Sequence, residues 1–216
     1  MQRRTLITGA LGLTAGLAGC AATQEEFEFE AEPAAFDDAA VNEAGYERVQ
    51  QQDIVVDRSV EAGGTERDVT VTNYATAYSR EVSVGDQTRP LASAVVFSTP
   101  SISIVGQEFN PAASENLLDL VARASDQLDD RFEAGSIRDI TKVEERDTTV
   151  LETETTMGVF DAVAETDGRE LTLRLLVARV QRDGDIIVVG AAYPQQLVEE
   201  ERSRAETLFG NVEHGA

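Results

Sequence analysis

The 216-residue chain carries 18 lysines and arginines against 40 aspartates and glutamates, which gives a formal net charge of −22. This balance leaves no basic footprint for nucleic acid and no polybasic patch for anionic lipid. One cysteine and one histidine exclude an intramolecular disulfide and the cysteine- or histidine-rich sites of zinc, copper and iron.

The chain opens with the pattern of an export signal. Arg3 and Arg4 precede an uncharged run over residues 6–19, which is too short to span ~30 Å of hydrocarbon. The letters RRTLI resemble a twin-arginine signal, and LAGC resembles a lipobox, in which cleavage behind Gly19 leaves Cys20 as a lipidated first residue. We expect residues 1–19 to be a signal peptide.

Cys20 is the expected attachment point to the membrane. One acyl chain holds a protein only marginally, so a diacylglycerol-type group is expected. A buried or free thiol is an alternative, as is an uncleaved N-terminal anchor, which would leave the domain on the same side of the membrane. Residues 20–26 form a tether that reaches at most ~25 Å when extended, and residues 27–213 are expected to form one extracytoplasmic domain.

Acidity continues through the chain that follows the signal. Removing Arg3 and Arg4 changes the net charge from −22 to −22 − 2 = −24, and Lys142 is the sole lysine. Because the charge lies in segments with a hydrophobic pattern, it indicates a folded domain and favours adaptation to molar salt, where the Debye length is ~3 Å. Carboxylate clusters such as Asp126, Asp129 and Asp130 are therefore interpreted as solvated surface, with an oxygen-ligated calcium or magnesium site as the alternative. No metal site and no cofactor are assigned.

The first half of the domain predicts strands around one short helix. The alternation of FEFE predicts a strand with Phe27 and Phe29 on its apolar side, and Asp37 can cap a helix that Gly45 ends. Two long strands follow about a Gly63–Gly64 turn within residues 47–85, and a buried strand over residues 91–105 is interrupted at Pro100.

The second half predicts a long helix, a series of hairpins and a final helix. Asn110 and Pro111 mark the start of a helix that ends within residues 132–135. Turns at Asp167–Gly168 and Asp183–Gly184 join antiparallel strands; the strands are expected over residues 137–143, 148–155, 159–166, 171–181 and 185–194, before a helix over 195–209. This order predicts an α+β fold, in which an antiparallel sheet is covered by a mid-chain helix and a C-terminal helix.

Several stretches carry a family resemblance. The signal and lipobox, together with FEFEAEPAAF, VFSTPSISIVGQEFNP, TETTMGVFDA and VGAAYPQQL, resemble a family of uncharacterised lipoproteins of salt-loving archaea, a domain of unknown function. The resemblance implies a lipid-anchored extracytoplasmic location and no particular activity. The order of elements in the second half is also similar to the Mog1/PsbP-type sandwich, which implies a binding or accessory role.

The chain offers little for nucleophilic catalysis. His214 is the single histidine and follows the last helix, and Lys142 lies in a charged strand without a serine motif nearby. No catalytic residue is therefore assigned.

Two polar stretches are candidates for ligand binding. Tyr193, Gln195 and Gln196 stand where the apolar strand meets the last helix, and an exposed tyrosine beside two amides could contact a sugar or a peptide. Tyr74 and Tyr78 share one hydroxyl-rich strand face. Each stretch also has a structural interpretation, as a strand end with a first helical turn and as the solvated side of a sheet.

Three functions follow from these observations. The first is a lipid-anchored binding or accessory module of the cell envelope without catalysis, whose partner is an envelope protein or a glycan. The second is a structural component that assembles through an apolar patch of several hundred Å². The third is a carboxylate-dependent hydrolase, which requires a deep cleft that holds two acids.

Overall fold

The computed structural model describes residues 27–62, 64–84, 87–104, 107–122, 137–166 and 169–215. Arg3, Arg4, Cys20 and the tether lie outside this part of the chain, as do Asp126, Asp129 and Asp130. The elements are β1 (Phe27–Glu30), β2 (Ala34–Phe36), α1 (Asp38–Ala44), β3 (Glu47–Ala62), β4 (Thr65–Val84), β5 (Gln87–Pro100), β6 (Ser103–Ile104), β7 (Gln107–Glu108), α2 (Pro111–Ser114), β8 (Ile137–Val150), β9 (Thr153–Thr166), β10 (Arg169–Arg182), β11 (Asp185–Pro194), the 3₁₀ helix η1 (Gln195–Leu197), α4 (Val198–Phe209) and β12 (Val212–His214).

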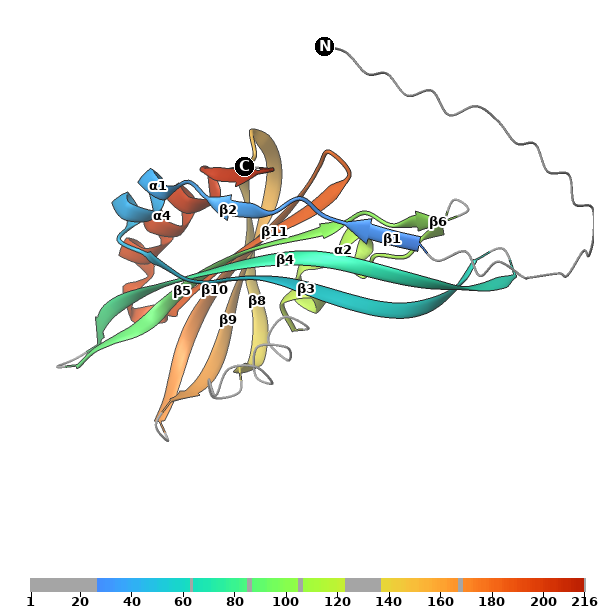
Figure 1. Cartoon of the computed structure of the whole chain (residues 1–216). Coiled ribbons are helices and arrows are strands. Elements are labelled where there is room, and N and C mark those ends of the chain that lie inside the picture. Colours follow the sequence, from blue (N-terminus) through green and yellow to red (C-terminus); the bar gives the residue numbers. More distant parts are fainter. Residues whose placement is uncertain are drawn as a thin grey trace, which may run out of the picture.

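Eight strands form one large sheet (Figure 1), in the order β1-β4-β5-β11-β10-β9-β8, with β3 on the other side of β4. Both β1 and β5 pair with the same side of β4, one after the other along its length. All pairs within the sheet are antiparallel except β1 with β4, which is parallel. The expected α+β fold is confirmed in outline, but the sheet is mixed and not purely antiparallel.

The two faces of the sheet are both covered, which explains the apolar run of β11. Ile187 and Val189 belong to the core that packs against α1 and α4, whereas Ile186 and Val188 pack against α2. Successive side chains of a strand point to opposite faces, so a strand buried on both sides reads as continuously hydrophobic.

One face is closed by two helices whose ends the sequence marks. Asp37 caps α1 by accepting a hydrogen bond from the Ala40 N–H at 2.9 Å, and Gly45 ends the helix at φ +72°. Helix α4 packs beside α1 and buries Leu208 and Phe209. No described helix is long and apolar enough to cross a membrane.

The helical layer on the other face is interrupted at residues 115–116, and the predicted helix end within residues 132–135 lies outside the described part of the chain. Helix α2 ends after one turn, since Glu115 is extended at ψ 148°. Asn116 then starts a second helical stretch over residues 117–122, accepting a hydrogen bond from the Asp119 N–H at 3.0 Å. The prediction of one continuous helix from residue 111 is wrong, because the Asn116 side chain caps a new helix.

The strands after residue 137 also differ from the prediction. A two-residue turn at Leu151 and Glu152, with φ of +51° and +60°, joins β8 to β9. The expected strand over residues 148–155 is therefore wrong, because the chain reverses in its middle. The Asp183–Gly184 turn is confirmed, with φ of +51° and +96°.

A single carboxylate ties the two ends of the described domain together. Asp185 accepts a hydrogen bond from the Glu32 N–H at 2.7 Å, and its Oδ2 lies 2.9 Å from His214 Nε2. Strand β12, which ends at His214, pairs with β2 beside this contact.

Candidate functional site

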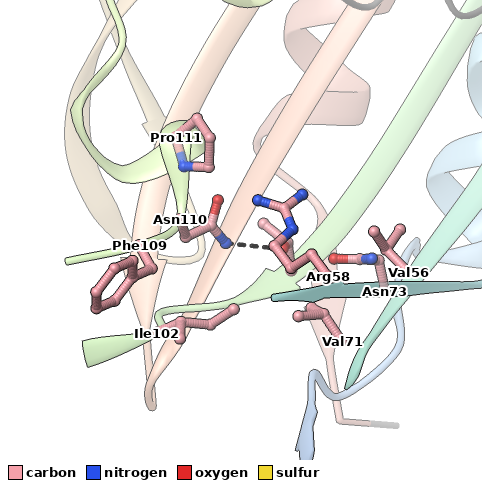
Figure 2. A pocket seen from close by; sticks show the side chains of 9 residues that line it. Val56, Arg58, Val71, Asn73, Ile102, Phe109, Asn110 and Pro111 are labelled. Carbon is pink, nitrogen blue, oxygen red and sulfur yellow. Dashed lines mark hydrogen bonds between the residues drawn. The ribbon is translucent and has the colours of Figure 1, made fainter. Parts of the chain in front are cut away.

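A hollow of about 50 Å³ opens on the α2 side of the sheet, at the end where β1 and the outer part of the β3–β4 hairpin lie (Figures 1 and 2). One water molecule needs roughly 10–15 Å³ of such space, so the hollow has room for a few waters or for one carboxylate or phosphate group. Its lining comes from β3, β4, β5 and the segment that leads into α2, and consists of Val56, Arg58, Val71, Asn73, Thr99, Ile102, Phe109, Asn110 and Pro111.

Asn110 fixes one wall of the hollow. Its side-chain amide donates hydrogen bonds to Thr99 Oγ1 at 2.8 Å and to the Pro100 carbonyl at 2.6 Å, and its Oδ1 accepts from the Ala112 N–H at 2.9 Å. These bonds join the end of β5 to the start of α2. The capping role expected for Asn110 is confirmed, and the same side chain holds the wall rigid.

Asn73 forms the floor on the opposite side. It is buried in β4, where the alternation of Val69 and Val71 would place another apolar residue. Its amide donates to the Ile54 carbonyl at 2.9 Å, which leaves the second amide hydrogen and the carbonyl oxygen without a partner in the described chain. A buried amide with spare hydrogen-bonding capacity beside a hollow can serve a ligand or an ordered water.

Arg58 supplies the charge at the rim. Its side chain is exposed and makes no hydrogen bond or ion pair with any described residue, although the chain has more than twice as many acidic as basic residues. Figure 2 shows the Arg58 guanidinium and the Asn110 amide on the same side of the hollow. A guanidinium presents five N–H donors in a planar fork that matches carboxylate and phosphate oxygens.

The hollow therefore combines a free cation, a partly used amide and apolar walls. None of its lining residues is a carboxylate, a histidine or a cysteine, so it contains no general base and no metal-ligand set. In the part of the chain that the structure describes, no three histidine, cysteine, aspartate or glutamate side chains are placed to hold a metal ion. The arrangement suits binding of a small anionic group.

The expected exposure of Tyr193 is wrong. Its side chain is fully buried, because it lies on the same face of β11 as Val189 and Ala191 and packs under α4. Its hydroxyl has no hydrogen bond of good geometry among the described residues, although the Arg202 guanidinium lies close beside it. Burial raises the pKa of Tyr193 to about 12, against the opposing positive charges of Arg202 and Arg174.

The two glutamines beside Tyr193 differ from each other. Gln195 is half-buried and donates to Asp161 Oδ2 at 3.2 Å, while Asp161 also binds Arg174 at 2.8 Å. Gln196 is exposed. Gln195 thus helps to fix the start of the last helix to the sheet, whereas a ligand contact by Gln196 stays a prediction.

Tyr74 and Tyr78 lie on one face of β4, as predicted, but in different surroundings. Tyr78 is buried, and its hydroxyl accepts a hydrogen bond from the Phe36 N–H at 3.0 Å. Tyr74 is half-buried and donates to Glu30 Oε1 at 2.6 Å, and this hydrogen bond raises the pKa of Tyr74. The structure does not bring these tyrosines together with Tyr193 into one site.

A second polar cluster is structural. Glu201 of α4 is fully buried and receives hydrogen bonds from Arg80 and from the Tyr46 hydroxyl, the latter at 3.2 Å; Arg204 Nε lies 3.7 Å away. Burial and the neighbouring Glu201 charge raise the pKa of Tyr46. A buried carboxylate needs such partners to offset its desolvation, so the cluster fastens α4 to the sheet.

Comparison with known proteins places the chain in a family. A family model described as a domain of unknown function, DUF6517, matches residues 33–213. The chain belongs to this family. No curated protein matches it.

The solved structures that match this DUF6517 chain have low sequence identity and low structural similarity to it. The Synechocystis PsbP protein CyanoP is 12% identical, with a TM-score of 0.40 over 92% of this chain and 98% of that one. A Pseudomonas aeruginosa protein of unknown function, PA94, a putative regulator, is 11% identical (TM-score 0.33, 68% and 89% covered), and Mycobacterium tuberculosis LpqN, involved in cell envelope biogenesis, is 10% identical (TM-score 0.30, 78% and 90% covered). TM-scores this low carry no argument about what the DUF6517 domain does.

Sequence reasoning missed the Arg58 hollow. Arg58 looked like one charge among many on a long strand, and only the three-dimensional structure shows that it forms no ion pair with any described carboxylate. Asn73 did carry a signal, since it is the polar residue in the apolar alternation that begins with Val69 and Val71. A polar side chain at a core position of a strand indicates either a buried hydrogen bond or a site, and here it provides both.

Proposed function

We propose that the chain is a lipid-anchored extracytoplasmic module that binds a small anionic group in the Arg58 hollow and catalyses no reaction of its own. The observation that carries this proposal is that Arg58, which pairs with no described residue, stands above a polar, carboxylate-free hollow in a chain of net charge −22. In such a chain an exposed arginine that forms no ion pair with a described carboxylate suits an anionic ligand.

The anchor part of the proposal is supported by the signal pattern and by the position of Cys20 at its end. The resemblance to lipoproteins of salt-loving archaea points the same way, and the high acidity is proposed as adaptation to molar salt. Both parts are testable by themselves. Intact-mass measurement on membrane-extracted protein should find a chain that begins at Cys20 with added lipid, and a Cys20→Ser variant should lose both the lipid and membrane retention.

The alternatives have less support. A carboxylate-dependent hydrolase needs two acids in a cleft, whereas the lining of the hollow contains none. The hydrogen bond from Arg146 lowers the pKa of Glu144, which is the wrong direction for a general acid. Assembly through a contiguous apolar patch is also less favoured, because the exposed large apolar side chains Val49, Val55, Leu118 and Val143 come from three different elements.

Ligand binding can be tested with acetate and inorganic phosphate as probes on the ¹⁵N-labelled full chain. Titration should shift the side-chain amide resonances of Asn73 and Asn110, which line the hollow. Arg58→Gln should abolish the shifts. Arg48→Gln is the matched control, because Arg48 is exposed on the same strand but pairs with Asp38 at 2.8 Å.

Two outcomes would contradict the binding proposal. One is the absence of any shift at Asn73 and Asn110 up to high probe concentration. The other is an equal response in the Arg58 and Arg48 variants, which would mean that the anions act on the protein through general ionic strength.

A further inference from the structure

In the outer half of the β3–β4 hairpin (residues 53–62 and 65–74), with β1 beside it, acidic and basic side chains lie on opposite faces. Residues that pair directly across neighbouring strands share a face, and the pairs place all described acidic side chains of this region on one side. This acidic face consists of Glu28, Glu30, Asp53, Asp57, Glu61, Glu66 and Asp68.

The opposite face of the same strands has arginines and aromatic rings in place of acids. Arg58 pairs across from Val69, and Arg67 from Val60. Arg67 lies over the ring of Phe27 with 5.4 Å from its guanidinium carbon to the ring centroid. We call this the arginine–aromatic face; it consists of Phe27, Phe29, Arg58, Val60, Arg67 and Phe109.

This face lies where the proposed anchor meets the domain. Phe27 is only seven positions after Cys20, so the linking segment reaches at most ~25 Å. Figure 1 shows β1 and this end of the hairpin at the opposite end of the molecule from α1 and α4. A domain on so short a tether must therefore present this end to the membrane.

From this juxtaposition we propose that the arginine–aromatic face rests on the anionic lipid surface that holds the anchor, with the Arg58 hollow taking a headgroup phosphate and the acidic face turned away. The inference rests on the proposed anchor and deepens the proposed ligand to a phosphate of the membrane itself. Aromatic rings with a polar rim suit the headgroup region. Two arginines do not form a polybasic patch, but each contributes a factor of about five near an anionic surface.

The opposite orientation is disfavoured by the same charges. It would bring the seven carboxylates of the acidic face to an anionic surface, without a basic side chain among them. Exposed charges interact within about one Debye length, 8–10 Å at moderate salt and ~3 Å at molar salt, so the face that touches the lipid decides the orientation even though the whole chain is negative.

The chain contains no tryptophan, which makes a single introduced tryptophan a clean probe of orientation. Phe29→Trp and Val60→Trp would report from the arginine–aromatic face, and Val55→Trp from the acidic face, where Val55 is 55% exposed and pairs across from Thr72. Each lipidated full chain is placed on vesicles of equal parts phosphatidylglycerol and phosphatidylcholine with brominated acyl chains. Bromine quenches tryptophan only at short range.

The expected result is strong quenching from positions 29 and 60 and weak quenching from position 55. Adding Arg58→Glu and Arg67→Glu should reduce the preference by at least about 25-fold, since two positive charges are lost and two negative ones are added, or reverse it; Arg48→Glu should not. The two tryptophan positions on one face guard against a variant that fails to fold.

The failures are distinguishable. Equal quenching from both faces, or a preference unchanged by the arginine replacements, overturns the orientation and leaves the anchor standing. Release of every chain from the vesicles, as expected for Cys20→Ser, overturns the anchor and this inference with it.

Discussion

Two buried tyrosines under α4 allow one chemical change to be compared in two environments. Tyr46 donates a hydrogen bond to the Glu201 carboxylate at 3.2 Å, whereas the Tyr193 hydroxyl has no hydrogen bond of good geometry among the described residues. Replacing each by phenylalanine removes one oxygen from a buried ring. The free energy of unfolding should respond to the two changes very differently.

The magnitudes follow from the partners. A hydrogen bond to a charged group contributes about 1.5–3 kcal/mol, so Tyr46→Phe should lower the free energy of unfolding by that amount at pH 7. An unpaired buried hydroxyl is itself a cost of about 1–3 kcal/mol. Tyr193→Phe should therefore be neutral or stabilising by up to about 1 kcal/mol, since the small cavity offsets part of the gain.

The pH dependence separates the two sites further. The pKa of Tyr193 rises from 10.0 in the unfolded chain to about 12 in the folded protein. Between these values the unfolded state has lost the proton and the folded state keeps it, so stability falls as the pH rises. At pH 11 the loss is about 1.4 kcal/mol. Tyr193→Phe removes this loss of stability. Tyr46 is present in both the variant and the wild type, so its own pH-dependent contribution cancels in their difference.

Urea unfolding of the wild type and both variants at pH 7 and pH 11 is the assay. Between pH 7 and pH 11, the free energy of unfolding of Tyr193→Phe should rise by about 1.4 kcal/mol relative to that of the wild type. A loss of about 2 kcal/mol or more for Tyr193→Phe at pH 7 would mean that the hydroxyl has a partner. An unchanged difference at pH 11 would refute the raised pKa.

Three further changes test the packing and the polar contacts, each by urea unfolding. Gly158→Ala should cost about 1–3 kcal/mol, because its Cβ would lie 2.7 Å from the buried Phe160 ring, and Gly190→Ala should cost less, since its nearest contact is a side-chain carbon at 3.2 Å; equal effects would contradict this. Glu201→Gln should cost about 2–4 kcal/mol because it leaves the half-buried Arg80 and Arg204 without their counter-charge, and an unchanged midpoint would show the cluster to be dispensable. Asp185→Ala should cost about 1–3 kcal/mol and speed hydrogen exchange at the Glu32 amide; continued protection of that amide would show that another group holds it.

Local signals in the sequence were reliable where the side chain of a residue and its backbone conformation favour the same cap or turn. Asp37 and Gly45 bound α1 as predicted, and Asp183–Gly184 forms the expected turn. The break at Asn116 carried the same type of signal, an amide three residues before an aspartate, but the apolar spacing that continues through residue 121 concealed it.

Other features depend on contacts that no local pattern contains. Leu151 and Glu152 adopt left-handed angles without the glycine or asparagine that usually marks such a turn, because the pairing of β8 with β9 imposes it. The parallel β1 joins β4 across some forty positions of chain. The hollow arises in the same way, since Arg58, Asn73 and Asn110 meet only when β3, β4 and the entry to α2 are assembled.

The contact of Asp185 with the Glu32 amide and the His214 imidazole has a consequence for the order in which the fold can be completed. It joins an amide at position 32 to an imidazole at position 214, so it cannot form before the ribosome has added His214. Every strand of the large sheet is already synthesised by then. The contact is therefore completed only after every strand of the large sheet has been made, and a protein cut short before His214 would keep the Glu32 amide on Asp185 but lose the imidazole.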